Sequence, residues 1–471
     1  MNNQQELSQE PIGKLLLKYS IPAIIGMIIN ALYNVVDRIF IGNIPGIGGI
    51  AMSALGIGMP MITILLAFAM LLGVGSTSLI SIKLGQGHKQ DAEKIISNTL
   101  LLGIITGINL MVVGFIFIDD LLILFGASQE MLDYAKQYIN IILLGSVVNI
   151  IGFSINSNMR ADGSPMMSAI TMTIGCLLNI VLDALFVNGI AIKINQEVTL
   201  FLGIKWGIEG AAIATIISQL VTCIIGIWYF TLGKSHLKIR LKDMKLDKKI
   251  IVGILGIGMS PFAMQIAASL VQTIANHALM NNGGELAVGA MTTIASIAIV
   301  FLMPIFGINQ GAQPIVGFNY GAKKYDRAKK TVILAIIIST IILTVEFLVI
   351  RLFPEYIISK FNNNNQLISI ALEGIQIYLS TLPIIGIAII GTVYFQAIGK
   401  AMVSMILSLL RQVILLIPLY LILPRYFGIK GVWWTQPICD IISTIVVIVV
   451  LAREFRIALN KQDQTNNALQ N

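Results

Sequence analysis

The feature that most constrains this chain is a series of apolar runs, each about 20 residues long, that recur from Ile21 to Val449. An α-helix of that length crosses the hydrocarbon core of a membrane. Hydrophobic residues make up 56% of the chain and charged residues only 11%, whereas a soluble domain carries about 25% charged residues. Transmembrane β-strands alternate apolar and polar residues, but these runs are apolar on every face. The sequence therefore predicts an all-α membrane protein.

The runs divide into about twelve predicted transmembrane helices. Their expected bounds are 17–40, 51–80, 95–117, 135–158, 166–188, 208–231, 250–278, 286–317, 328–352, 368–397, 402–423 and 431–452. The polar segment before the first run lacks the layout of a cleaved signal peptide. We therefore expect the first run to remain in the protein as a helix.

Lys and Arg are unevenly distributed between the two sets of predicted loops. An even number of spans places both termini on one side, and the side richer in Lys and Arg is the cytoplasm. The terminal side carries 22 of these residues and the opposite side 8. We therefore expect a multi-pass protein of the bacterial inner (plasma) membrane with both termini cytoplasmic. This bias also accounts for the net charge of +8, so no nucleic-acid partner is expected.

The chain matches itself at an offset of 236 residues. The aligned pairs include Ala51 with Ala287, Gly75 with Gly311, Gly85 with Gly321, Ala161 with Ala397, and Gly163 with Gly399. After the fifth span the offset drops to 221, where 207–210 aligns with 428–431. The extra residues fall in NGIAIKINQEVTLFLGIKW, whose alternating pattern predicts a short extracellular β-hairpin in the first half only.

The repeat predicts two six-helix lobes. Halves with an even number of spans share one orientation, so a pseudo-two-fold axis along the membrane normal is expected to relate them. Two lobes around a midplane site are typical of secondary transporters. The expected parts are an N-terminal lobe at 1–232, a basic cytoplasmic linker at 233–249, a C-terminal lobe at 250–453 and a polar tail at 454–471.

Two carboxylates fall inside predicted spans of the first half. Asp37 and Asp183 lie at similar depths in the outer half of the membrane, where an ionisable group costs several kcal/mol. Such a pair binds Na⁺, or carries a proton if burial and mutual repulsion raise one pKa. The alternative is structural, with Asp37 capping a helix end beside Arg38 and Asp183 bonded to Asn179.

Uncharged polar residues accompany these carboxylates. Asn30, Tyr33 and Asn34 form a polar stripe one to two turns before Asp37, and Asn179 is one turn from Asp183. We expect the two faces to converge. Pro22 interrupts the same first span, and bending there would move Asp37, so we interpret Pro22 as a hinge.

In the second half, Arg411 and Asp440 lie at matching depths in the last two spans. Each charge makes the other tolerable, so the spacing favours a buried ion pair that clamps the structure, with a coupling site as the alternative. The role of Glu346, in the outer half of the ninth span, stays open.

No motif predicts catalysis. There is no HExxH and no phosphate-binding GxxxxGK[ST] loop, and the three cysteines and three histidines are scattered. We therefore expect neither an enzyme nor a cofactor, and no metal apart from Na⁺ at Asp37 and Asp183.

Five segments together carry a family resemblance that covers nearly the whole chain. They are Pro22 with ALYNVVDRIFIG, the GQG loop after the second span, MRADGSP, NIVLDALF and GIEGAAIAT. In combination the chain resembles the multidrug and toxic compound extrusion (MATE) family, in its MepA-type or DinF-related bacterial branch. The resemblance implies export of amphipathic, often cationic, drug-like compounds by H⁺ or Na⁺ antiport. It also implies that Asp37, Asn179 and Asp183 form the cation site and that Pro22 bends the first helix.

Two further expectations follow from this comparison. Some members carry acidic residues in the seventh and tenth helices, which this chain lacks, so coupling is expected in the N-terminal lobe, in a protein that acts as a monomer. The alternative function is a lipid-linked oligosaccharide or lipid flippase of the same superfamily. Such a cavity needs several cationic residues, and only Arg411 lies away from the ends of the predicted spans.

Overall fold

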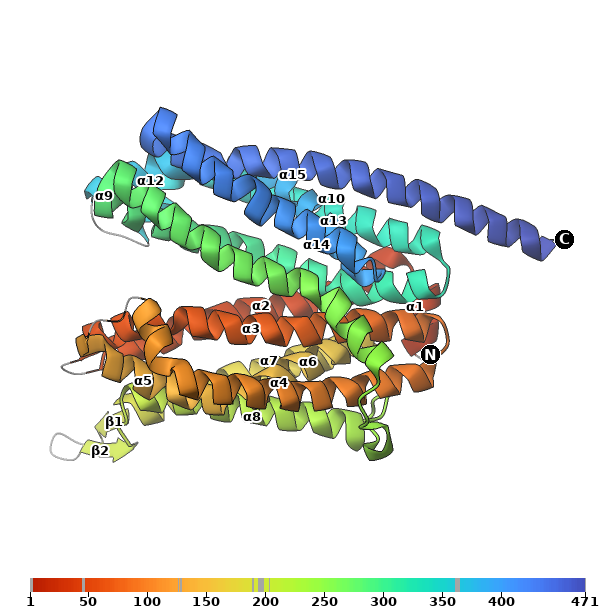
Figure 1. Cartoon of the computed structure of the whole chain (residues 1–471), viewed down its shortest axis with the longest axis horizontal. Coiled ribbons are helices and arrows are strands. Elements are labelled where there is room, and N and C mark those ends of the chain that lie inside the picture. The colour runs from red at the N-terminus through yellow and green to blue at the C-terminus, as the bar shows by residue number, and fades with distance from the viewer. Residues whose placement is uncertain are drawn as a thin grey trace. The chain divides into compact units, whose positions relative to one another are not determined.

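The computed structural model shows a chain that is almost entirely helical (Figure 1). It describes residues 3–44, 47–125, 127, 129–188, 190–193, 199–202, 204–360 and 365–470. The chain divides into two compact units. The first-half unit comprises Ile25–Ile80 and Lys89–Gly258, and the second-half unit comprises Met1–Ile24, Ser81–His88 and Met259–Asn471.

Helices α4, α6 and α8 form the centre of the first-half unit. The elements of this half are α2 (Ile12–Gly42), α3 (Gly48–Gly85), α4 (Lys89–Leu124), α5 (Gln129–Leu144), α6 (Ser146–Ala161), α7 (Pro165–Asp183), the π-helical turn η1 (Ala184–Asn188), β1 (Ile190–Lys193), β2 (Thr199–Leu202), α8 (Ile208–Thr231) and the 3₁₀ turn η2 (Leu241–Asp243). Helix α6 packs between α4 and α8, and α8 also contacts α5 and α7. Leu122, Ile139 and Leu143 are fully buried in its core.

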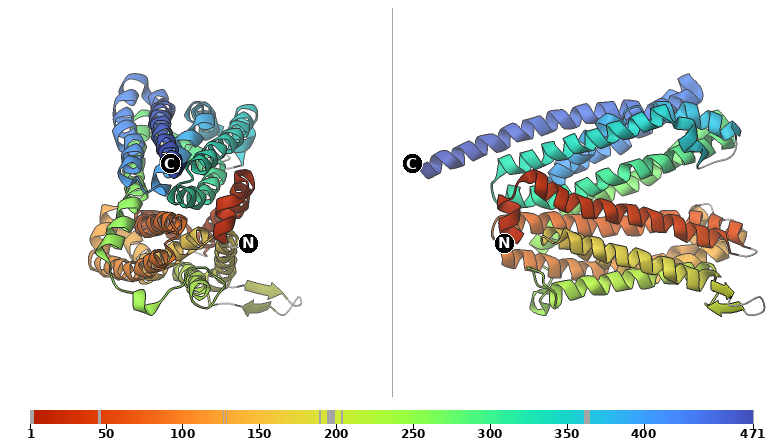
Figure 2. Two further views of the ribbon diagram at one scale, coloured as in Figure 1. Left: turned by 90° about the vertical axis from the view of Figure 1, so that its right-hand side faces the viewer. Right: turned by 180° about the vertical axis from the view of Figure 1, so that it is seen from behind.

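The second-half unit repeats this packing. Its elements are α1 (Asn3–Gln9), α9 (Lys248–Gly321), α10 (Tyr325–Leu352), α11 (Pro354–Ser359), α12 (Asn365–Tyr378), α13 (Leu382–Ala397), α14 (Ala401–Leu409), the π-helical turn η3 (Leu410–Leu416) and α15 (Ile417–Gln470). Helix α13 packs between α10 and α15, as α6 packs between α4 and α8. The end of α15 extends beyond the other helices of its unit (Figure 2).

The predicted β-hairpin is confirmed. Strands β1 and β2 pair antiparallel, with Ile190 opposite Leu202 and Lys193 opposite Thr199. The hairpin follows η1 directly and precedes α8 (Figure 1).

The described helices account for the predicted number of spans. Nine stretches are long and apolar enough to cross a membrane, and two bent helix pairs raise the number to eleven. One of the nine, Ala401–Ile457, contains Gly428 in a non-helical conformation. Two spans meet there, so the described residues contain twelve in all.

Two of the predicted spans are each formed by a bent pair of helices. The span expected at 135–158 is α5 and α6, bent by 53°, and that at 368–397 is α12 and α13, bent by 57°. Gly145 lies at the first break, where a Cβ would come 2.6 Å from the Ile216 side chain. Pro383 is the second residue of α13, and because it has no backbone N–H it favours a helix start at this point.

The internal repeat extends to backbone conformation. Gly163 has φ 89° and its counterpart Gly399 has φ 79°, while Gly207 and Gly428 have φ 60° and 55°. Side chains other than glycine rarely adopt this left-handed region. The aligned glycines therefore make equivalent turns in the two halves.

Candidate functional site

One face of α2 lies along one face of α7 in the first-half unit. A Cβ on Gly26 would lie 3.2 Å from the Met172 sulfur, and Asn30 hydrogen-bonds the thiol of Cys176. Each contact joins residues 146 positions apart, the separation that also relates Asp37 to Asp183. The two helices therefore run side by side in a constant register that leads to the carboxyl pair.

Asp37 and Asp183 meet at the end of this register. Their side chains hydrogen-bond to each other, and their exposed fractions are 8% and 0%. Two carboxyl groups can share a hydrogen bond only if one of them holds a proton. In the part of the chain that the structure describes, Oδ1 of each residue is buried without a hydrogen-bond partner. The pair thus has free acceptor capacity.

Asn179 orients Asp183. In the amide orientation that gives both the Asn179 nitrogen and oxygen a hydrogen-bond partner, Nδ2 donates to Oδ2 of Asp183 at 3.1 Å and Oδ1 accepts from the Thr215 backbone N–H at 3.3 Å. Thr215 belongs to α8, so this amide links α7, α8 and the carboxyl pair. Asn179 is 2% exposed, which holds the arrangement away from water.

The alternative interpretation, in which both carboxylates have only structural roles, fits Asp183 but not Asp37. Asp183 does bond Asn179, as that alternative requires. Asp37, however, does not cap a helix end, because α2 continues to Gly42. Arg38, its neighbour, is exposed, whereas Asp37 is buried.

Sequence reasoning missed Tyr138 on α5. This buried side chain interacts electrostatically with Asp37, Asp183 and Tyr33. Tyr33 belongs to the predicted polar stripe, and the side chain of Asn34, the third member of that stripe, lies outside the described residues. Only the amphipathic pattern of α5 could have suggested that Tyr138 faces the core.

Pro22 lies inside α2, just before α2 passes from one unit to the other at Ile24. The preceding part of α2 is held closely against α9. A Cβ on Gly311 would lie 2.6 Å from Ser20 Oγ, and a Cβ on Gly307 would lie 2.4 Å from Ile24 Cγ1. The segment around Pro22 is thus fixed on α9, while the part that carries Asp37 belongs to the other unit.

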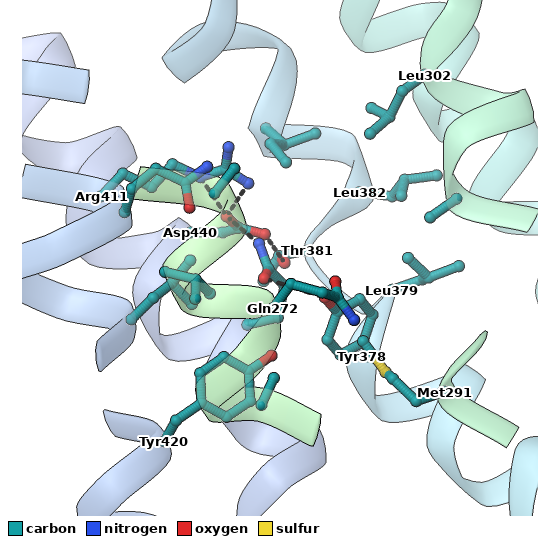
Figure 3. Close-up of a pocket in the computed structure, with 18 residues that line it drawn as sticks. Gln272, Met291, Leu302, Tyr378, Leu379, Thr381, Leu382, Arg411, Tyr420 and Asp440 are labelled. Atoms are coloured by element: carbon teal, nitrogen blue, oxygen red, sulfur yellow. Dashed lines mark hydrogen bonds and ion pairs between the residues drawn. The ribbon is translucent and has the colours of Figure 1, made fainter. Parts of the chain in front are cut away.

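A second polar centre lies in the second-half unit. Nε and Nη2 of Arg411 donate to Oδ1 of Asp440 at 3.1 and 2.9 Å (Figure 3). Gln436 Nε2 donates to the same oxygen at 3.0 Å, and Thr381 Oγ1 donates to Oδ2 at 3.2 Å. The pair borders a cavity of about 240 Å³. Glu346 is separate from it, on α10, and its Oε2 is buried without a partner among the described residues.

Both charged centres adjoin π-helical turns. Asp183 is the last residue before η1, and Arg411 lies within η3. Such turns occur often at functional sites. In the described ranges no group of three or more His, Cys, Asp or Glu side chains is placed to hold a metal ion.

Comparison with known proteins gives consistent matches over the whole chain. The MatE family profile matches residues 22–185 and 261–422. The multidrug export protein MepA of Staphylococcus aureus (strain MRSA252) is 26% identical over 450 residues, which cover 94% of each chain. The crystal structure of MATE in the straight conformation is 25% identical, with a TM-score of 0.88 over 98% of this chain and 99% of that one. The structure of MATE in the bent conformation shares the fold at 24% identity and a TM-score of 0.88, over 98% and 99%.

Proposed function

The chain belongs to the MatE family, and from this premise we propose that it exports drug-like compounds from the cell in exchange for protons. Its relative from Staphylococcus aureus is a multidrug export protein, and the expected substrates are amphipathic and often cationic. The Lys and Arg distribution supports cytoplasmic termini. The internal repeat supports operation as two lobes, 1–232 and 250–453, within one monomer.

The observation that carries this proposal is the hydrogen bond between Asp37 and Asp183. Both side chains are buried, and a buried carboxylate pair favours holding one proton over carrying two negative charges. Release of that proton leaves two like charges in contact. The resulting repulsion supplies the free-energy difference that a coupled transporter needs between its loaded and unloaded states.

Proton coupling fits the described partners better than Na⁺ coupling. Asn179 donates its amide N–H to Asp183 and uses its oxygen on Thr215, so this amide is not free to act as a cation ligand. The carboxyl pair alone offers two unpartnered oxygens. Hard cations such as Ca²⁺ take six to eight oxygens, whereas a proton needs only the two carboxyl groups.

Pro22 gives a route from the proton to movement. A proline inside a helix removes one backbone hydrogen bond, which weakens α2 at the point where it leaves its contacts with Gly307 and Gly311. Bending there moves the part of α2 that carries Asp37. Charge repulsion from Asp183 would therefore act directly on the helix segment beyond the hinge.

The test is export of a fluorescent cationic dye from proteoliposomes under an imposed pH gradient or an imposed Na⁺ gradient. We expect the pH gradient to drive export by the wild type. Asp37→Asn and Asp183→Asn should each abolish it. Each variant keeps only one carboxyl group at the site, so no proton can be shared between two carboxyl groups. Asp120→Asn is the matched control, since Asp120 is an exposed carboxylate on α4, and it should export like the wild type.

Three results would contradict the proposal. Gradient-driven export that persists in both carboxyl variants would exclude this pair as the coupling site. Export driven only by the Na⁺ gradient would show that Na⁺, and not the proton, is the coupling ion. Absence of dye export by folded wild type under both gradients would instead favour the flippase alternative, which fluorescent-lipid translocation in the same vesicles would then reveal.

A further inference from the structure

The cavity of about 240 Å³ lies wholly within the second-half unit. It is enclosed by both parts of α9, by α12 and α13 around their bend, and by η3 and α15. Figure 3 shows Arg411 and Asp440 on one side and apolar side chains, among them Leu302 and Leu382, on the other. None of the residues proposed for proton coupling lines this cavity.

The internal repeat explains why the cavity occurs in this half. Arg411 aligns with Gly175 at the offset of 236, and Asp440 aligns with Gln219 at the offset of 221. In the first-half unit α7 lies directly on α8, since a Cβ on Gly175 would come 2.4 Å from Cγ2 of Thr222. The second half replaces this glycine with an arginine inside a π-helical turn. The space that helix packing closes in one half is therefore kept open in the other.

Arg411 is the charged group that faces the cavity. Its side chain is 22% exposed, against 4% for Asp440. Asp440 is saturated by donors from Arg411, Gln436 and Thr381. Nη1 of Arg411 makes no hydrogen bond to any residue within the described ranges, so the cavity presents a charged donor and a shielded carboxylate.

The remaining walls suit a flat apolar body. Tyr378 and Tyr420 hydrogen-bond to each other, and Tyr378 Oη donates to Gln436 Oε1 at 3.2 Å. Met291 and Leu382 complete the apolar side. Aromatic and sulfur side chains pack favourably on an aromatic ring. The volume is below the roughly 300–1,000 Å³ of sites for drug-sized ligands, which restricts the occupant to a small molecule.

We propose that this cavity is a binding site for small aromatic carboxylates, separate from the proton pair. The carboxylate accepts hydrogen bonds from the free edge of the Arg411 guanidinium, a geometry that planar carboxylates match well. The ring packs between the two tyrosines and Met291. Asp440 is a positioning residue that fixes the guanidinium through its two hydrogen bonds.

The experiment measures binding of radiolabelled benzoate to the purified full-length protein in detergent, with unlabelled benzoate, benzamide and benzamidine as competitors. These three share one ring and differ in charge. Benzoate should compete at least roughly tenfold better than neutral benzamide, because a hydrogen bond to a charged group is worth more than a neutral one. Benzamidine should not compete.

Variants make the assignment specific to Arg411. The double variant Arg411→Gln/Asp440→Asn removes both charges together, avoids an unpaired buried carboxylate, and should lose saturable benzoate binding while remaining folded. Lys430→Gln is the matched control, since Lys430 pairs with Glu373 at an exposed position of the same unit, and it should bind benzoate like the wild type.

The proposal would be overturned by three results. These are benzamidine competing better than benzoate, unchanged benzoate binding in the folded double variant, or no saturable binding to the wild type. Dye export is measured in parallel, after the same protein is reconstituted into proteoliposomes. It reports on the proton pair alone, so the two proposals fail independently.

Discussion

Asp37 on α2 and Asp183 at the end of α7 hydrogen-bond to each other in a site that almost no solvent reaches. The contact depends on the register between the two helices, in which Asn30 meets Cys176 two turns earlier. Any change in the bend or rotation of α2 beyond Pro22 therefore alters the distance between the two carboxyl groups. In the proposed mechanism, this contact links proton binding to the geometry of α2.

The packing of α9 against α3 gives a sharp test of the fold. A Cβ on Gly258 would lie 1.8 Å from the Leu71 carbonyl oxygen, whereas a Cβ on Gly256 would meet nothing within 4 Å. Gly258→Ala must push the two helices apart, so we expect it to destabilise the protein by about 2 kcal/mol or more. Gly256→Ala is the matched control and should be neutral or stabilising by up to about 1 kcal/mol. Thermal unfolding in detergent measures both, and equal midpoints would contradict this packing.

The Arg411–Asp440 ion pair predicts that the stability losses of the two single variants do not add up in the double variant. Arg411→Gln alone leaves the buried Asp440 carboxylate without its cation, which costs about 3–5 kcal/mol when a buried pair is broken. Arg411→Gln/Asp440→Asn removes both charges and should cost clearly less than either single change. Unfolding midpoints of the three variants test this, and additive losses would show that the two side chains do not interact.

The loop after α6 predicts a pH dependence of stability. Burial raises the pKa of Asp162 to about 6, although hydrogen bonds from Tyr229, His236 and Leu237 act in the opposite direction. The folded state therefore binds this proton more tightly than the unfolded state, whose pKa is near 3.8. The resulting stabilisation is present below pH 4 and is lost as the pH rises through 6, by at most about 3 kcal/mol.

Asp162→Asn isolates this contribution. As the pH rises from about 4 to 7, the unfolding midpoint of the wild type should fall relative to that of the variant. Asp120→Asn, at an exposed carboxylate of α4, should show no such relative change. Parallel pH profiles for the wild type and Asp162→Asn would contradict the raised pKa.

Much of the fold could be predicted because two local features of the sequence determine it. The apolar runs give the positions of the helices, and the glycines aligned by the internal repeat mark equivalent turns in the two halves. The span at 208–231 matches α8, and the alternating AIKI segment predicted β1. The bend between α12 and α13 lies beside Pro383, a proline that interrupts the predicted span, whereas the bend between α5 and α6 could not be derived, because the close approach of Gly145 to Ile216 depends on tertiary packing.

For the candidate site too, some features could be predicted from the sequence and others could not. Depth along a helix placed Asp37 near Asp183 and Arg411 near Asp440, because residue position and helix rise determine depth. Rotation about the helix axis depends on tertiary packing, so neither Tyr138 nor the cavity beside Arg411 could be predicted. The cavity is lined in part by η3, which has no distinct sequence pattern.

The central claim is that Asp37 and Asp183 together hold the proton exchanged for substrate. Its most direct test is proton release by the purified protein at pH 7, in weakly buffered detergent with a pH indicator, when a transported cationic dye is added. We expect release of about one proton per wild-type or Asp120→Asn molecule and none from Asp183→Asn. Equal release from Asp183→Asn would contradict it.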